Sequence, residues 1–283
     1  MASTFTTALF GLASAASWGA GDFSGGLATR RTAVLPVAVV SQGAAFAILL
    51  GVAFVRYEPI PALHTLAWGS AAGLCGVVGI ASLYRALAVG VMGIAAPVSG
   101  VLAAAFPVAF AAFTQGLPTA WQITGFGLAM AGVWLVSRPQ GTVRTGGLGL
   151  AVLSGIGFGG FYILISRAQA ASVFWPLAAS KATSLGAVAA ASAIAARTRP
   201  DAFAPPPVGL LPLMLASGVL DAGGNVFFVL AEHAGRLDVA SVLASLYPAS
   251  TVMLARVVLR ERLSPTQAMG VAAVLTAIPL IVG

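Results

Sequence analysis

The uncharged run from Ala86 to Ser137 reads ALAVGVMGIAAPVSGVLAAAFPVAFAAFTQGLPTAWQITGFGLAMAGVWLVS and decides the fold class. About 20 apolar residues in an α-helix cross the roughly 30 Å hydrocarbon core of a membrane, so this run is long enough to cross twice. Further uncharged runs extend over residues 32–55, 145–166 and 263–283. The chain is therefore predicted to be a polytopic membrane protein.

The composition supports membrane insertion and excludes a soluble fold. Of 283 residues, 59% are hydrophobic and 7% are charged, whereas soluble domains carry about 25% charged residues. The apolar runs are hydrophobic nearly all round and lack the two-residue alternation of membrane β-strands, so the expected fold class is all-α. We assign the net charge of +7 to short loops, where basic residues set topology rather than bind nucleic acid.

Hydrophobic runs separated by proline, glycine and charged residues predict ten transmembrane helices. Their expected ranges are 4–28, 34–55, 66–88, 94–115, 119–137, 147–166, 173–196, 208–232, 237–258 and 264–282. The connections between these ranges are too short to contain a soluble domain.

The sequence also repeats itself, at an offset of 140 to 146 residues. Matching positions are Phe106-Pro107 with Tyr247-Pro248, Ser14 with Ser154, and Gly19 with Gly159. We therefore expect two units, residues 1–141 and 142–283, with five helices in each. Because five is an odd number, the second unit must enter the membrane inverted relative to the first. Many transporters share this plan and bind their solute near the midplane between the repeats.

Several short motifs resemble the duplicated EamA-type unit of the drug/metabolite transporter superfamily. They are Tyr84-Arg85-Ala86-Leu87-Ala88, Ala95-Ala96-Pro97, Phe106-Pro107, Arg260-Glu261-Arg262-Leu263-Ser264-Pro265 and Gly270. Within the superfamily the chain is most similar to bacterial exporters of aromatic amino acids. The resemblance implies ten helices around a central cavity lined by the first, third, fourth, sixth, eighth and ninth of them. One departure is that the charged turn Glu261-Arg262 has no counterpart in the first unit, which has Gln115-Gly116.

The candidates for lining this cavity are Trp18, Tyr84, Ser99, Phe158, Asn225, Ser241 and Ser245. Trp18 matches Phe158 in the repeat, and two such aromatic faces would sandwich an apolar or aromatic group of a substrate. The polar candidates would bind its carboxylate or amine. The alternatives are packing for the aromatic residues and hydrogen bonds to helix carbonyls for the serines.

Three ionisable residues lie well inside the predicted helices: Asp22, Lys181 and Asp221. Each costs about 2.5–3.5 kcal/mol at a helix centre and is usually kept for a reason. Asp221 lies one turn before Asn225, so the two residues face the same way and could bind an amine or titrate during transport. Alternatively, Asp221 pairs with Lys181 and fixes the packing of the second unit.

Three prolines, Pro97, Pro107 and Pro248, lie inside predicted helices. Each removes one backbone hydrogen bond, so the prolines are candidate hinges for alternating access, or else static bends.

The sequence predicts a secondary transporter rather than an enzyme. It contains no Walker A motif, and its two histidines, His64 and His233, lie in or beside loops, which disfavours metal catalysis. The resemblance implies export of aromatic and other large neutral amino acids across a bacterial inner membrane, without a cofactor. A broad drug or nucleotide-sugar exporter is the nearest alternative, and a lipid-handling or assembly subunit a more distant one. Because both units lie in one chain, a monomer is expected.

Overall fold

The computed structural model describes residues 2–88, 92–137, 148–168, 172–198, 206–259 and 264–282, and these residues contain helices and no strand. The helices are α1 (Ala2–Thr29), α2 (Val34–Val55), α3 (Leu63–Ala88), α4 (Met92–Thr114), α5 (Ala120–Ser137), α6 (Leu148–Arg167), α7 (Phe174–Thr198), the short 3-10 helix η2 (Val208–Leu210), α8 (Leu211–Ala234), α9 (Leu237–Ala244), α10 (Tyr247–Val258) and α11 (Pro265–Val282). The all-α prediction is confirmed.

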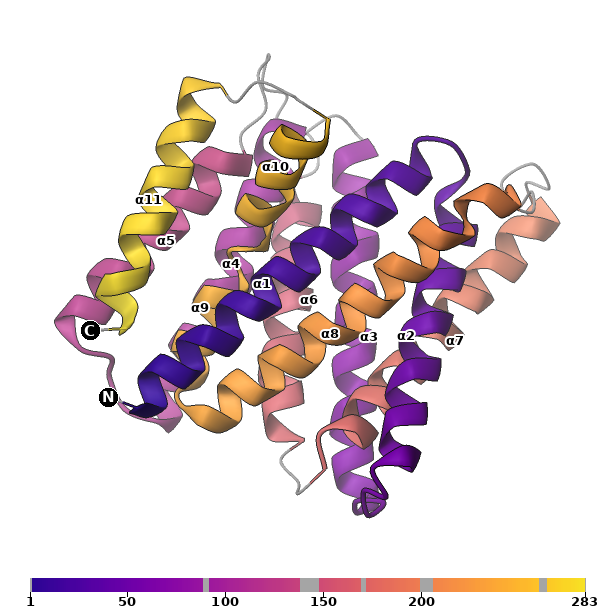
Figure 1. Ribbon diagram of the computed structural model, residues 1–283, viewed down its shortest axis with the longest axis horizontal. Helices are drawn as coiled ribbons and strands as arrows, with labels where there is room; N and C mark the ends of the chain where they lie inside the picture. Colours follow the sequence, from indigo (N-terminus) through magenta and orange to yellow (C-terminus); the bar gives the residue numbers. More distant parts are fainter. Residues whose placement is uncertain are drawn as a thin grey trace.

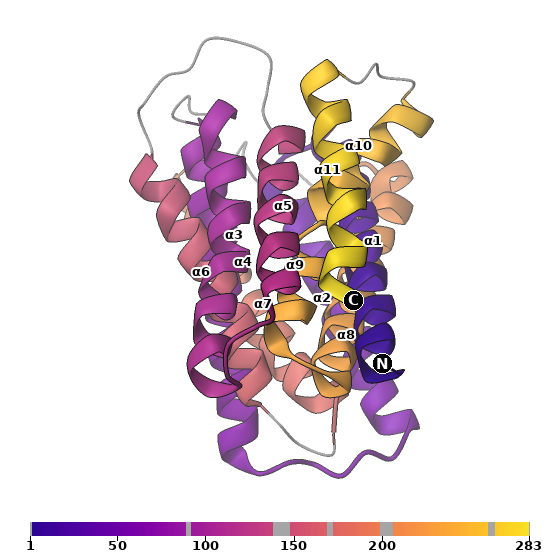
Figure 2. The ribbon, with the colours of Figure 1, turned by 90° about the vertical axis from the view of Figure 1, so that its left-hand side faces the viewer.

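Helices of this length and composition belong in a membrane. Eight segments of the described chain are long and apolar enough to cross one, with α9 and α10 counted as a single span, and α4 contributes a shorter apolar helix over residues 98–114. Figures 1 and 2 show these helices side by side with α1. Both termini lie toward the lower end of these views. The protein is therefore a multi-pass membrane protein.

The predicted ninth helix is interrupted. Instead of one helix over residues 237–258, α9 ends at Ala244 and α10 begins at Tyr247. Pro248 has no N–H to donate, and its ring would collide with the carbonyl four residues earlier, so the helix cannot continue through this point unchanged. The Leu246 N–H bonds instead to the Leu243 carbonyl at 3.2 Å. Pro248 then occupies the first turn of α10, where proline is favourable.

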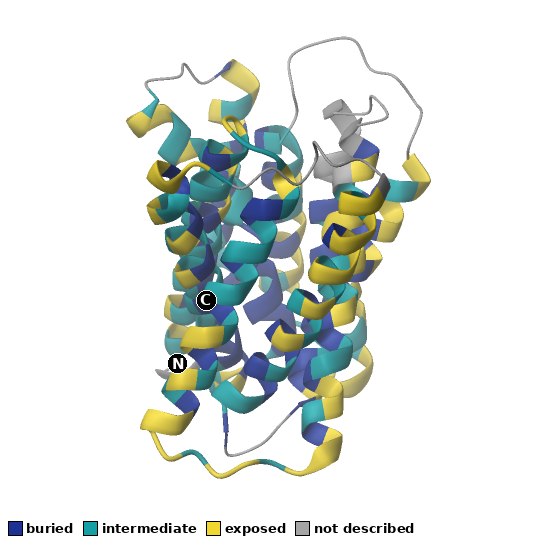
Figure 3. Cartoon of the chain, turned by 90° about the vertical axis from the view of Figure 1, so that its right-hand side faces the viewer, coloured by how far each residue is buried: buried dark blue, intermediate teal, exposed yellow. Residues whose placement is uncertain are grey.

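The packing of the helices is reciprocal. α1 lies along α8 and α6 lies along α3, while α2 packs on α7 and α5 packs on α11. Figure 1 also shows that α1 runs upward and α6 downward. Figure 3 shows that buried residues face the interior of the bundle and exposed ones face outward.

Glycines bring the backbones of packed helices into close contact. A Cβ at Gly73 of α3 would lie 2.2 Å from the Ser180 carbonyl oxygen of α7, and one at Gly157 of α6 would lie 2.5 Å from the Gly79 nitrogen of α3. Small residues at such crossings let membrane helices pack closely.

Gly73→Ala is therefore expected to destabilise the protein by about 1–3 kcal/mol, because a backbone carbonyl cannot move aside as a flexible side chain could. The measurement is the apparent Tm of the detergent-solubilised protein, followed by tryptophan fluorescence. Gly51→Ala in α2 is the matched control, because a Cβ there would meet nothing within 4 Å. Equal Tm values for the two variants would contradict the close α3–α7 contact.

Candidate functional site

An aromatic cluster from three helices occupies the interior of the bundle. Trp18 comes from α1, Phe161 and Tyr162 from α6, and Phe228 from α8. The rings of Tyr162 and Phe228 stack with centroids 4.6 Å apart, and the Trp18 ring lies 5.8 Å from Tyr162 and 6.1 Å from Phe228. The cluster joins helices from both predicted units, and its rings pack against one another in the core, with Phe228, Tyr162 and Phe161 buried.

Trp18 is positioned by the contact between α1 and α8. Its indole ring lies on Gly224, where a Cβ would come within 2.4 Å of the ring. The hydroxyls of Ser14 and Ser17 donate to the carbonyls of Gly224 and Leu220, at 2.8 and 2.7 Å. These serines next to Trp18 therefore bind the neighbouring helix, and they fix the depth of the tryptophan.

Phe158, the repeat mate of Trp18, has an equivalent environment on the other side of the bundle. Its ring lies on Gly79 of α3, where a Cβ would come within 2.8 Å of the ring. The structure does not bring the Phe158 and Trp18 rings into contact. Tyr162, one turn after Phe158 on α6, meets Trp18 instead.

Two of the three membrane charges form a pair. Lys181 Nζ of α7 lies 2.5 Å from Asp221 Oδ2 of α8. Asn225 is buried and donates its amide to Asp221, to Oδ1 at 3.1 Å and to the backbone carbonyl at 2.5 Å. Asp22 on α1 belongs to no such pair: in the described chain it makes no hydrogen bond and no ion pair.

The three candidate serines fall into two groups. Ser99 of α4 bonds to Ser154 of α6, with their Oγ atoms 2.7 Å apart. Ser241 in the last turn of α9 and Ser245 at the break before α10 are buried, and within the described chain their Oγ atoms make no hydrogen bond of normal geometry, although the Tyr162 hydroxyl lies beside Ser245. Ser245 also faces a small hollow between α4, α5 and α9, lined by Gly100, Ala104, Ala129, Met130, Val133, Val242 and Leu246.

The remaining candidates are Tyr84 and the three prolines. The side chains of Tyr84 and Pro97 lie outside the described residues. Pro107 lies within α4, which continues as a helix to Thr114, whereas Pro248 follows the break between α9 and α10. Among the described residues, no group of three or more His, Cys, Asp and Glu side chains could hold a metal ion.

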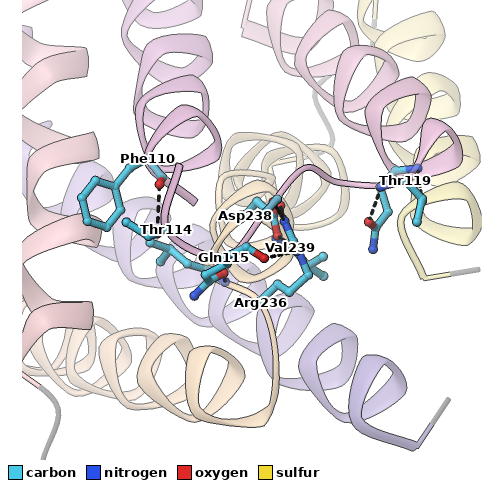
Figure 4. Close-up of polar contacts among 10 residues, drawn as sticks. Phe110, Thr114, Gln115, Thr119, Arg236, Asp238 and Val239 are labelled. Carbon is cyan, nitrogen blue, oxygen red and sulfur yellow. Dashed lines mark hydrogen bonds and ion pairs between the residues drawn. The ribbon is translucent and has the colours of Figure 1, made fainter. Parts of the chain in front are cut away.

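Polar contacts between loops close the end of the molecule where the termini lie. Arg236, between α8 and α9, binds the buried Asp238 through Nη2 at 2.6 Å and donates to the carbonyls of Gln115 and Gly116, between α4 and α5. The Leu237 N–H bonds to the Gln115 side chain at 3.0 Å. Figure 4 shows this group, which we call the Arg236 clamp. Gly116 has a φ of +85°, a left-handed conformation that favours glycine.

A second contact at the same end involves Glu58, between α2 and α3. Its carboxylate accepts from the Ser172 hydroxyl at 2.5 Å and from the Phe174 N–H at 3.1 Å, so it caps the N-terminus of α7. The Trp175 indole N–H donates to the Glu58 carbonyl at 3.0 Å. This Glu58 cap and the Arg236 clamp both join loops of the two predicted units.

Ser99→Ala or Ser154→Ala alone leaves the other hydroxyl buried without its partner, and each is expected to cost about 1–3 kcal/mol. The double variant should cost much less than the sum, because it removes both polar groups. Apparent Tm values of the four proteins measure this coupling. Thr276→Ala is the control, because that exposed hydroxyl bonds only within its own helix, to Ala272. Strictly additive losses would show that the two serines act independently.

Fold and interior together define an all-helical, polytopic membrane protein whose core contains aromatic and polar groups. Residues 145–283 match the model of the EamA-like transporter family. The second half of the chain is thus an EamA-like transporter domain, and the protein is a membrane transporter of small molecules. This confirms the superfamily predicted from the motifs, whereas the similarity to aromatic amino-acid exporters stays a prediction.

The other comparisons concern the fold. A solved structure titled "Crystal structure of protein" is similar to this chain, with a TM-score of 0.76 and 15% identity, covering 97% of this chain and 95% of the other. Among curated proteins, none matches the sequence.

Proposed function

We propose that this protein is a secondary transporter that exports amino acids, aromatic and other large neutral ones, across a bacterial inner membrane. One observation carries the proposal: two buried serine hydroxyls lie at an interrupted membrane helix, and in the described chain Ser241 has no hydrogen-bond partner while Ser245 has only the neighbouring Tyr162 hydroxyl of the aromatic cluster. An unsatisfied buried hydroxyl is costly and marks a place where a polar ligand group would bind favourably. The aromatic rings would hold the ligand's side chain.

The interruption of the ninth span suits a carboxylate. α10 begins inside the bundle, and the N-terminus of a helix carries a partial positive charge. Interrupted transporter helices commonly direct such an end at an anionic group of the substrate. Ser241 and Ser245 lie on the last turn before this end. We assign the substrate carboxylate to these two hydroxyls and to the first turn of α10.

Alternating access is proposed to occur between residues 1–141 and 142–283. The reciprocal packing of α1 on α8 and α6 on α3 supports this division, because exchanging the two units leaves the pattern unchanged. The Arg236 clamp and the Glu58 cap join the two units at one end, so both must break before the interior opens there. A single chain would suffice, since it contains both units.

The test is uptake into liposomes that contain the purified protein. We expect saturable flux of radiolabelled large neutral amino acids, and flux with and without an imposed pH gradient shows whether protons drive it. Trp18→Ala should raise KM at least tenfold, because it removes most of the aromatic surface. Flux of drugs or nucleotide sugars without amino-acid flux would replace the proposal by the corresponding exporter. Absence of flux for every solute would favour an assembly or lipid-handling role.

A further inference from the structure

Asp22 is exposed on the face of α1 that is otherwise buried. Residues three and four apart share a helix face, so Asp22 lies on the same face as Trp18 and Gly19. Trp18 meets the aromatic cluster, and Gly19 packs against Tyr247 and Ser250 of α10. The side chain of Asp22 is nevertheless exposed. Beyond Gly19 the strip of α1 that contains Asp22 is therefore uncovered, whereas Gly21, Gly25 and Ala28 beside it still pack on neighbouring helices or are buried.

Gly26 extends this uncovered strip by one more turn. It follows Asp22 by four residues, is exposed, and has no atom within 4 Å of the position a Cβ would take. The lipid-facing side of α1 is elsewhere on the helix, where Phe5 and Leu9 are exposed. Asp22 thus lies on a different side of α1 from these exposed apolar residues, on the side that carries Trp18.

Among the described residues, no cation pairs with Asp22. The Lys181 ammonium of α7 already pairs with Asp221 of α8, at 2.5 Å. The backbone of Asp221 lies next to Gly21, so the second carboxylate adds negative potential near Asp22. The Tyr162 ring contacts Trp18, one turn before Asp22 on α1, and the Tyr162 hydroxyl lies beside Ser245. Asp22 is therefore at one edge of the candidate site, with Ser245 and Ser241 beyond Tyr162.

We propose that Asp22 binds the ammonium group of the transported amino acid. The inference rests on the proposed function and deepens it. An ionised carboxylate at membrane depth is costly without a partner, and a charge-assisted hydrogen bond from a bound ammonium group compensates that cost. The faces of Trp18 and Tyr162 beside the site further favour a cation. Asp221 has a structural role instead, because Lys181 and Asn225 already occupy its oxygens.

This arrangement assigns the two ends of a zwitterion to different places. The ammonium group binds at Asp22, and the carboxylate binds at Ser241, Ser245 and the first turn of α10. Amines and carboxylic acids that share the same aromatic side chain should therefore respond to different substitutions.

The experiment measures equilibrium binding of radiolabelled L-phenylalanine to the purified full-length protein, with phenethylamine and 3-phenylpropionate as competitors. Asp22→Asn should weaken phenylalanine and phenethylamine at least tenfold and leave 3-phenylpropionate within about twofold, the tenfold loss being about 1.4 kcal/mol. The pair Ser241→Ala and Ser245→Ala should show the opposite pattern. Asp201→Asn, in the polar connection after α7, is the matched charge control and should change none of the three.

Retained competition by 3-phenylpropionate shows that the Asp22→Asn protein is folded. Asp22→Glu, which keeps the charge, should recover part of the phenethylamine affinity. If wild-type protein binds phenylalanine and Asp22→Asn binds phenethylamine equally well, the role of Asp22 is wrong while the proposed function stands. If wild-type protein binds no amino acid, the proposed function fails and this inference fails with it.

Discussion

Replacing Asp221 by asparagine is expected to destabilise the folded protein by about 3–5 kcal/mol, because it leaves the Lys181 ammonium buried without a counter-ion. The Lys181 side chain is 8% exposed, and its Nζ lies 2.5 Å from the carboxylate. Asparagine keeps only one side-chain oxygen, so it cannot accept from Asn225, as Asp221 Oδ1 does at 3.1 Å, and also turn an oxygen toward Lys181. The expected observations are a lower yield of monodisperse protein and an apparent Tm that falls by many degrees.

The matched variant removes both charges. Lys181→Met together with Asp221→Leu replaces the pair by apolar side chains of similar length, and such replacements are often neutral or stabilising. We expect this double variant to recover most of the lost Tm and to transport amino acids. A folded double variant without transport would show that the pair takes part in the transport cycle, and an Asp221→Asn protein of wild-type stability would contradict the structural role.

The helices were predictable because hydrophobic runs are local. Nine of the ten expected ranges agree with the structure to within three residues at each end, counting η2 with α8. The prediction of one continuous ninth helix was wrong. Pro107 and Pro248 occupy matching positions of the repeat, yet α4 continues through Pro107 and the ninth span breaks before Pro248. A proline allows either a bend or a break, and the packing around it, which sequence does not display, decides which occurs.

The site was predictable only where one residue carries an intrinsic cost. A lysine and an aspartate inside membrane helices each need a partner, so the Lys181–Asp221 pair was one of two readings, and the structure forms it. Tyr162 and Phe228 were missed because aromatic residues in apolar helices are unremarkable until the faces that converge are known. A signal for Tyr162 was present, since it lies one turn after Phe158 and therefore shares its face.

The loop contacts could not be predicted from the sequence, for a different reason. Arg236 lies in a loop, and nothing local in the sequence relates it to Gln115 and Gly116, more than 100 residues earlier. Only the folding of two distant turns to the same end of the molecule brings these groups together.

Breaking the Arg236 clamp is expected to open the interior of the bundle to solvent at the end where the termini lie. Asp238 is fully buried, binds Arg236 at 2.6 Å and accepts from the Val239 N–H at 2.8 Å. Asp238→Ala leaves the Arg236 guanidinium without its carboxylate and α9 without an acid in its first turn, at a cost of about 3–5 kcal/mol to the closed arrangement. A state in which these loops have separated has already lost the contacts, so the substitution shifts the equilibrium toward it.

The measurement uses Ser245→Cys in a Cys75→Ala background, so that position 245 carries the cysteine to be labelled. The readout is the rate of labelling by a membrane-impermeant maleimide, which is added from each side of oriented vesicles in turn. Each 1.4 kcal/mol of shift changes the open population tenfold, so Asp238→Ala should raise labelling from the terminal side at least tenfold. Thr119→Ala is the matched control, because Thr119 lies in the same α4–α5 turn, is exposed, and its side-chain hydroxyl accepts only from the Gln122 N–H. Equal labelling in the two variants would mean that the clamp stabilises the loops without controlling access. Faster labelling in Asp238→Ala alone would identify the clamp as the contact that must break before the site opens at this end.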